Sequence, residues 1–258
     1  MLIAMKYSDC GVVISIKKYG EKSAILKVFS KERGVCRGFV KFLNSKKNAN
    51  IFQIGNIISF DHNARIEDSL GTFTNFDLIE NNCSKFIFNK LRTNCAKSII
   101  SIVDNYFLEK EPFHFLYTKF ENFLNNLGLF SYHDSQIIAE FIKLELIILE
   151  CLGYGVDFSC CVVTNSRVNL AFVSPKSAHA VSREAGEKFA HKLLRLPEFL
   201  IDESSNAFDD SQLIDGLNLS GFFLKKYLFI EQSPSQSALS NNFSNNFYRE
   251  NILKIIKN

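Results

Sequence analysis

Apolar and polar residues follow a strand-like pattern over residues 10–80. Short β-branched and aromatic runs alternate there with turns of Gly, Asn and Lys, at a spacing of about ten residues that is typical of small all-β domains. Such a pattern predicts a barrel of about five strands. Gly38 interrupts the third run, which predicts a bulge or a sharp bend of the kind that barrel closure needs.

The pattern becomes helical after residue 82. Apolar residues at helical spacings predict helices over 84–108, 113–127, 134–152, 182–195 and 210–231. The aromatic stripe within 113–127 has the composition of a base-stacking platform, but on a helix such a stripe more often belongs to the core. The segment 134–152 is apolar on most faces, so we expect it to be a central helix. Its carboxylates Glu140, Glu145 and Glu150 predict a polar face or pairs between helices.

These patterns predict an α+β chain. An N-terminal OB-fold β-barrel would precede an α-helical domain that carries a small hairpin insert, because residues 156–181 turn short and strand-like again. The stretch "QSPSQSALSNNFSNNFYREN" at 232–251 is rich in Ser and Asn, which predicts a polar tail. The expected division is a barrel over 1–80, a helical domain over 82–155 and 182–235, an insert over 156–181 and a tail over 236–258.

Charge is distributed unevenly along the chain. The formal net charge is only +3, yet residues 11–50 hold ten basic and two acidic residues. A basic module on a slightly acidic body is typical of proteins that bind a polyanion such as nucleic acid. A solvated, lysine-rich surface would produce the same count, so both readings stay open here.

Other features argue against several classes of protein. The most apolar segment is interrupted by charges, which disfavours a membrane span, and the N-terminus shows no secretion signal. Seven scattered cysteines predict a reducing compartment, here the cytoplasm. The phosphate-binding loops and the hydrolase nucleophile motif are absent, and the five histidines are isolated. We therefore expect neither an enzyme nor a cofactor. The weak alternative is an enzyme in which Cys160 is the nucleophile and His191 its base.

Three segments in order resemble one bacterial family. They are "ISIKKYGEKSAILKVFSKERGVCRGFVK" at 14–41, "FIKLELIILECLGYGVDFSCC" at 141–161 and "FVSPKSAHAVSREAG" at 172–186. The first resembles the opening strands of the recombination and repair mediator family RecO, the second its helix that closes in Leu-Gly-Tyr before a cysteine, and the third one branch of that family. The resemblance covers residues 10–230.

The resemblance implies a bacterial, nucleoid-associated protein without an active site. RecO proteins bind single- and double-stranded DNA, anneal complementary strands, contact the single-stranded DNA-binding protein, associate with RecR and help to load RecA in the RecFOR pathway. An electropositive barrel that tracks a phosphate backbone agrees with this role. The candidate DNA contacts are Lys17, Lys18, Lys22, Lys31, Arg33, Arg37, Lys41, Lys46 and Lys47. Phe39 and Phe42 are candidates to stack on bases, although strand alternation predicts that at least one of them is buried.

The adjacent cysteines of the insert depart from the family pattern. Many RecO proteins carry two CxxC pairs there, which together hold a tetrahedral zinc. Here Cys160 stands at the expected place with Cys161 beside it, Val163 stands three residues later, and no cysteine falls within 181–184. A set that used His179 would lack a chelating pair. We therefore expect no metal, and expect the apolar "CVV" and "LAFV" segments to pack on the helices with one cysteine buried.

Two rival hypotheses remain beside the mediator. The chain is a stand-alone single-strand-binding OB protein in the first, and an enzyme with an unrecognised site in the second. The mediator hypothesis also predicts that the helical body binds the acidic, apolar C-terminal tail of the single-stranded DNA-binding protein. Residues 113–152 would supply the apolar contacts, and Lys119 or Lys143 the cation at the rim.

Overall fold

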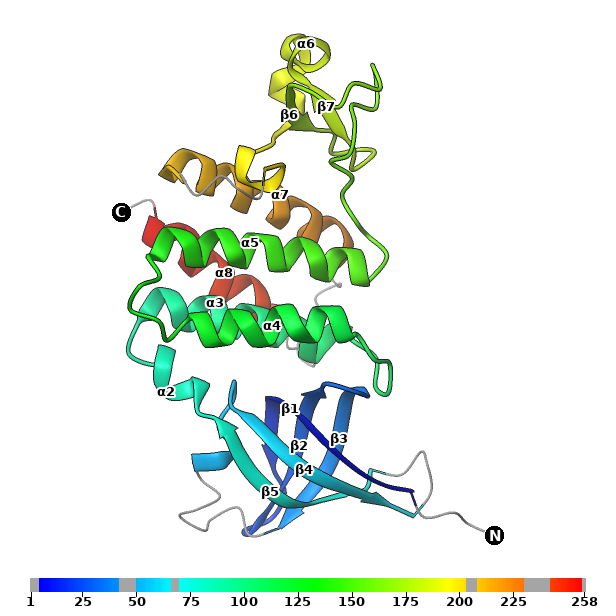
Figure 1. Ribbon diagram of the computed structural model, residues 1–258, viewed down its shortest axis with the longest axis vertical. Helices are drawn as coiled ribbons and strands as arrows, with labels where there is room; N and C mark the ends of the chain where they lie inside the picture. Colours follow the sequence, from blue (N-terminus) through cyan, green and yellow to red (C-terminus); the bar gives the residue numbers. More distant parts are fainter. Residues whose placement is uncertain (1–4, 42–49, 66–69, 203–207, 230–241, 257–258) are drawn as a thin grey trace. The chain divides into compact units, whose positions relative to one another are not determined.

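A computed structural model describes residues 5–41, 50–65, 70–202, 208–229 and 242–256 (Figure 1). The chain divides into two compact units, Met1–Leu129 and Phe130–Asn258. Among the residues described, no helix has the length and apolarity needed to cross a membrane.

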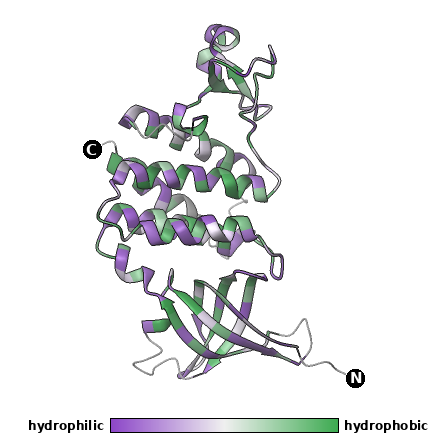
Figure 2. Cartoon of the chain, viewed as in Figure 1, coloured by the Kyte–Doolittle hydropathy of each residue, from purple (hydrophilic) through white to green (hydrophobic). Residues whose placement is uncertain are grey.

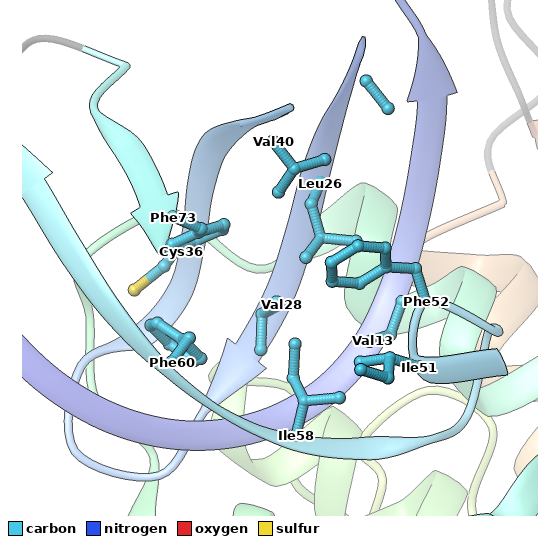
Figure 3. Close-up of a cluster of buried hydrophobic side chains, with 11 residues drawn as sticks. Val13, Leu26, Val28, Cys36, Val40, Ile51, Phe52, Ile58, Phe60 and Phe73 are labelled. Carbon is cyan, nitrogen blue, oxygen red and sulfur yellow. The ribbon is translucent and has the colours of Figure 1, made fainter. Parts of the chain in front are cut away.

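The first unit begins with a closed barrel, which confirms the predicted OB-like fold. Its strands are β1 (Met5–Lys18), β2 (Ser23–Ser30), β3 (Gly34–Lys41), β4 (Ile57–Ala64) and β5 (Thr72–Glu80). They close in the order β1-β2-β3-β5-β4. Hydrophilic and hydrophobic residues are interspersed along the strands (Figure 2), because one face of each strand lines the barrel interior. Leu26, Val28, Phe60 and Phe73 are among the buried side chains that fill it (Figure 3).

The barrel closes where β3 meets β5. Only Phe39 and Thr72 form a pair there, and the Phe39 amide donates to the Gly71 carbonyl at 3.0 Å. A Cβ atom on Gly38 would lie 2.7 Å from the Phe73 ring, so glycine is required for this close approach. The β2–β3 register runs through Gly38 without a shift, so the predicted bulge is absent there.

After the barrel the first unit continues with α2 (Asn82–Phe86), α3 (Lys90–Tyr106) and α4 (His114–Asn126). The predicted helix over 84–108 is divided, because the Asn89 side chain accepts from the Arg92 amide and starts α3 afresh. The fully buried Phe29 of β2 contacts Tyr117 and Phe120 of α4 at 5.9 and 6.2 Å between ring centroids. The first unit therefore joins these helices to the barrel, whereas the sequence prediction separates them after residue 80.

The second unit combines helices with a small sheet. Its elements are α5 (Asp134–Cys151), β6 (Leu170–Val173), β7 (Ala180–Ser182), α6 (Arg183–Gly186), η1 (Glu187–Lys192), β8 (Leu194–Arg195), η2 (Glu198–Leu200), α7 (Asp210–Tyr227) and α8 (Asn242–Ile256). The strands lie in the order β7-β6-β8. The predicted helix over 182–195 is present only in part: α6 ends at Gly186, the chain continues to Lys192 as the 3-10 helix η1, and Leu194–Arg195 form β8 instead.

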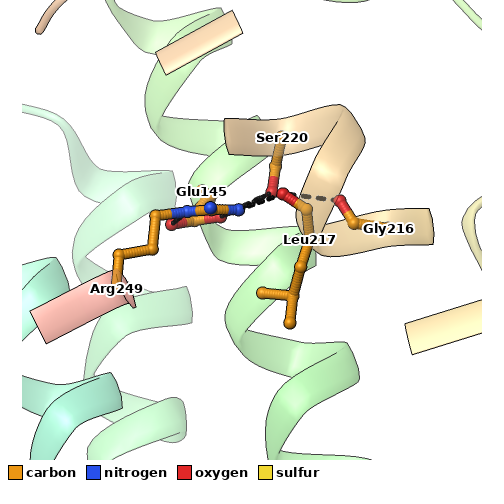
Figure 4. A network of polar contacts seen from close by, with 5 residues as sticks. All are labelled: Glu145, Gly216, Leu217, Ser220 and Arg249. Carbon is orange, nitrogen blue, oxygen red and sulfur yellow. Dashed lines mark hydrogen bonds and ion pairs between the residues drawn. The ribbon is translucent and has the colours of Figure 1, made fainter. Parts of the chain in front are cut away.

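The residues predicted as a polar tail include α8, which is anchored by a buried ion pair. Arg249 of α8 is 3% exposed and reaches Glu145 of α5, with 2.8 Å between Nε and Oε1 (Figure 4). Ser220 of α7 donates to the same carboxylate at 2.6 Å. Gly221 makes room for the guanidinium, because a Cβ there would lie 2.3 Å from it. Glu145 thus forms the interhelix pair that the sequence left open as one alternative.

We predict that Arg249→Met destabilises the second unit by about 3–5 kcal/mol, because it leaves a carboxylate buried without its cation. Urea unfolding followed by circular dichroism measures this. Lys254→Met, on an exposed position of the same helix, should change stability by less than about 0.5 kcal/mol. Adding Glu145→Gln to Arg249→Met should recover part of the loss. Equal unfolding midpoints for Arg249→Met and Lys254→Met would contradict a structural role for the pair.

Candidate nucleic-acid interface

The outer face of β1, β2 and β3 carries four basic side chains of the barrel. One row across the three strands consists of Lys17, its partner Ile25 on β2, and Phe39, which pairs with Ile25 on β3. Lys27 and Arg37 form the next row, and Lys41 stands opposite Ser23 at the strand end. Since residues of one row share a face, these cations point away from the barrel core.

An exposed aromatic residue lies at one end of this face. Tyr19 is 63% exposed and packs edge-on against Phe39, with 5.7 Å between ring centroids. It begins the β1–β2 turn, where Gly20 takes a φ of +70° that glycine tolerates best. The half-buried Phe39 contributes the second ring. In OB-folds, the face of the second and third strands and the first loop commonly bind oligonucleotides.

Four exposed lysines surround this aromatic pair, and together they define the β1–β3 patch: Lys17, Lys18, Lys22 and Lys41, with Tyr19 and Phe39. Lys17 and Lys18 lie on opposite faces of β1, since the partner of Lys18 is the buried Ala24. Lys18 is nevertheless exposed, because it stands at the end of the strand. None of the four lysines forms an ion pair with another residue of the described ranges. Their charges are therefore available to a polyanion.

The middle of the same face is neutralised by acidic residues. Lys27 Nζ lies 2.8 Å from Asp104 Oδ1 near the end of α3. Arg37 pairs through Nε with Glu109, in the connection between α3 and α4. The backbone of this connection is fixed to β3, because the Lys110 amide donates to the Val35 carbonyl at 3.0 Å. A phosphate at Arg37 would have to compete with Glu109.

The structure does not place the other candidate contacts in the patch. Lys31 and Arg33 lie in the β2–β3 turn, at the opposite end of β2 from Lys22. The Arg33 guanidinium stacks over the Tyr7 ring at 4.1 Å, and the Lys31 carbonyl contacts His114 Nδ1 at 2.9 Å. Lys46, Lys47 and Phe42 lie outside the described residues.

Sequence reasoning missed Tyr19 and the two acidic partners. Tyr19 could have been found, since an aromatic residue between Lys18 and the turn glycine suits a base-stacking position. Glu109 and Asp104 could not, because they stand more than seventy residues from the cations they neutralise.

Of the two adjacent cysteines in the insert, Cys161 is the buried one. It is 1% exposed, whereas Cys160 is half-buried. Burial opposes ionisation of the Cys161 thiol, but hydrogen bonds from Thr164 and from the Ser182 backbone help to lower its pKa, to about 6. No cluster of three metal-ligating side chains occurs within the ranges that the structure describes, and the absence of zinc stays a prediction.

One expectation for the insert is wrong. Val162 and Val163 are 50% and 69% exposed, so "CVV" does not pack as predicted. The chain forms a tight turn there, in which the Asn165 amide donates to the Cys161 carbonyl at 2.8 Å, and this turn directs the valines outward. The "LAFV" segment is buried at Leu170, Phe172 and Val173, as predicted.

Comparison with known proteins identifies the family. Residues 5–82 match the model described as "Recombination protein O N terminal", and residues 90–236 match "Recombination protein O C terminal". The chain belongs to the RecO family. It is 36% identical over 242 residues to DNA repair protein RecO of Wolbachia pipientis subsp. Culex pipiens, covering 92% of this chain and 97% of the relative. The RecO protein of Ehrlichia chaffeensis is 31% identical over 255 residues, 98% of each chain. RecO proteins are DNA repair proteins. The N-terminal match ends at residue 82, and the C-terminal match begins at residue 90, the first residue of α3.

For a RecO protein with this face, we predict that Glu109→Gln tightens binding to single-stranded DNA several-fold at low salt. The change frees Arg37 for one more phosphate, which should steepen the salt dependence by about 0.7 in log–log slope. Fluorescence anisotropy with a short oligo-dT at several salt concentrations measures both quantities. Glu111→Gln is the matched control, since this exposed acid lies in the same connection and forms no ion pair with the described residues of the barrel. Equal affinities of the two variants would show that Glu109 does not shield the site.

Proposed function

We propose that the chain binds single-stranded DNA on the β1–β3 patch, anneals complementary strands, and helps to load RecA onto protein-coated single strands together with RecR. The observation that carries this proposal is the set of four unpaired lysines around the exposed Tyr19, on the face and first turn of a barrel with OB-like strand order. Family membership supports it.

The chemistry of the patch suits annealing. Lysine ammonium groups contact phosphates and release counterions, which gives affinity without regard to sequence. Contacts to the backbone leave the pairing edges of the bases free for a complementary strand. Tyr19 and Phe39 offer a π-face for stacking, which every base can use. Such binding is strong enough to hold a strand and weak enough to release the duplex.

Partner binding belongs to the same proposal. The acidic, apolar tail of the single-stranded DNA-binding protein needs an accessible apolar side chain beside a cation. Of the two lysines considered, Lys119 meets this requirement, because its Nζ lies 5.4 Å over the ring of Phe115, which is 61% exposed. Lys143 lies 6.0 Å over Phe199, whose side chain is fully buried. The structure therefore favours Lys119.

A stand-alone single-strand-binding protein is the second candidate function. The unpaired lysines of the β1–β3 patch favour it equally, because DNA affinity alone would use the same residues. A RecR-dependent increase of RecA loading separates the two candidates, since a protein that acts alone would give none.

We predict that Lys17→Glu with Lys41→Glu weakens binding to all single-stranded sequences alike and lowers the rate of strand annealing. Each lost phosphate contact should reduce the salt slope by about 0.7. Anisotropy titrations and an annealing assay with complementary labelled oligonucleotides measure the two effects.

Lys90→Glu with Lys188→Glu makes the same charge change at exposed positions outside the patch, and should leave affinity and annealing close to those of the parent. If both double variants bind and anneal like the parent, the proposed site is wrong.

A further inference from the structure

The Gly-Tyr-Gly turn after α5 presents a tyrosine that the barrel site does not use. Tyr154 is 40% exposed and stands between Gly153 and Gly155. Its amide donates to the Leu149 carbonyl at 2.7 Å, which fixes the turn to the end of α5. Gly153 has a φ of +84°, and the space beside it is open where a side chain would project. At 40% exposure, part of the Tyr154 side chain is open to solvent.

Tyr154 is the outermost of three parallel rings. It stacks on Tyr227 of α7 with 4.6 Å between centroids and 9° between ring planes. Tyr227 in turn lies parallel to the fully buried Phe223, at 6.2 Å and 10°. Aromatic pairs in protein cores often meet edge-to-face, whereas nucleobases stack in parallel planes. The column thus runs from the core to an exposed face with its three rings in nearly parallel planes, and its outermost ring is one on which a base can stack.

Three lysines without acidic partners accompany this column. Lys226 Nζ lies 4.8 Å from the Tyr227 ring centroid and donates to the Pro175 carbonyl at 2.8 Å. That contact brings the exposed Lys176 beside it, and the exposed Lys225 precedes it in the last turn of α7. Within the described residues none of the three forms an ion pair. Asp157, an acidic side chain of the same region, faces His179 at 3.8 Å.

We infer that the Tyr154–Tyr227 column, with Lys176, Lys225 and Lys226, is a second contact for single-stranded nucleic acid, in the second unit of the chain. A base would stack on Tyr154, and the lysines would contact the adjoining phosphates. This inference rests on the proposed function and extends it. A chain with two separate contacts can hold a strand at one while the other engages a further segment or a second strand, as annealing requires.

Photo-crosslinking of the full chain tests this contact. Oligo-dT that carries 5-iododeoxyuridine is bound at low salt and irradiated, and the crosslinked peptides are identified by mass spectrometry. We expect a crosslink at Tyr154. Tyr154→Leu should abolish it and weaken oligo-dT binding roughly tenfold, as loss of one stacking contact does. Tyr154→Phe keeps the ring and should retain parental affinity.

The outcomes separate this inference from the proposed function. Crosslinks confined to residues 17–41, with Tyr154→Leu binding like the parent, would overturn the second contact and leave the barrel site standing. Absence of any crosslink together with absence of oligo-dT binding would overturn both. Binding of polyglutamate that depends on Tyr154, without binding of oligo-dT there, would overturn the inference in favour of an acidic peptide. Thermal unfolding of each variant checks that Tyr154→Leu remains folded.

Discussion

Closure of the barrel between β3 and β5 determines which side chains reach the candidate interface. The two strands share a single residue pair, and Phe73 can approach β3 only because Gly38 has no side chain. In this register of β3, Val40 points inward while Phe39 and Lys41 point outward. A shift by one residue would exchange the two faces. The outward position of Phe39 and Lys41 is therefore linked to how the core closes.

The helices that follow the barrel both complete its core and limit its charge. Phe29 buries its ring against α4, and the connection between α3 and α4 holds Glu109 against Arg37. The cationic face is thereby divided into a neutralised middle and an open end. In the second unit, Glu145 and Arg249 likewise neutralise each other. Their burial is tolerated because both side chains are hydrogen-bonded. The lysines near Tyr154 have no acidic partner in the part of the chain that the structure describes, which sets them apart from these structural pairs.

Local patterns in the sequence were sufficient for the barrel and for the long helices. The ten-residue spacing of strands and the aromatic stripe of α4 are short-range signals, and each element forms where its pattern predicts. The helix predicted over 182–195 divides into α6 and the 3-10 helix η1, and its last residues form β8. The partners of β8 are Phe172 and Val173, more than twenty residues earlier in the chain, and periodicity does not show such a pairing. The frequent Asn and Ser residues of the C-terminal segment predict a polar tail, yet Arg249 finds its partner 104 residues earlier in the chain.

The candidate site was only partly predictable for the same reason. A basic segment can be counted in the sequence, but which lysines remain unpaired depends on Asp104 and Glu109, which the fold brings back to the barrel. Composition therefore located the cationic region. Only the tertiary structure shows that Asp104 and Glu109 neutralise Lys27 and Arg37 but leave Lys17 and Lys41 accessible.

Lysine footprinting of the full chain tests most directly whether DNA binds the open end of this face. The chain is acetylated with and without saturating oligo-dT at low salt, and the modification of each lysine is quantified by mass spectrometry. The account predicts strong protection of Lys17, Lys22 and Lys41 by the oligonucleotide and little change at Lys27, which Asp104 already holds. Unchanged acetylation of Lys17, Lys22 and Lys41 in a chain saturated with DNA would contradict it.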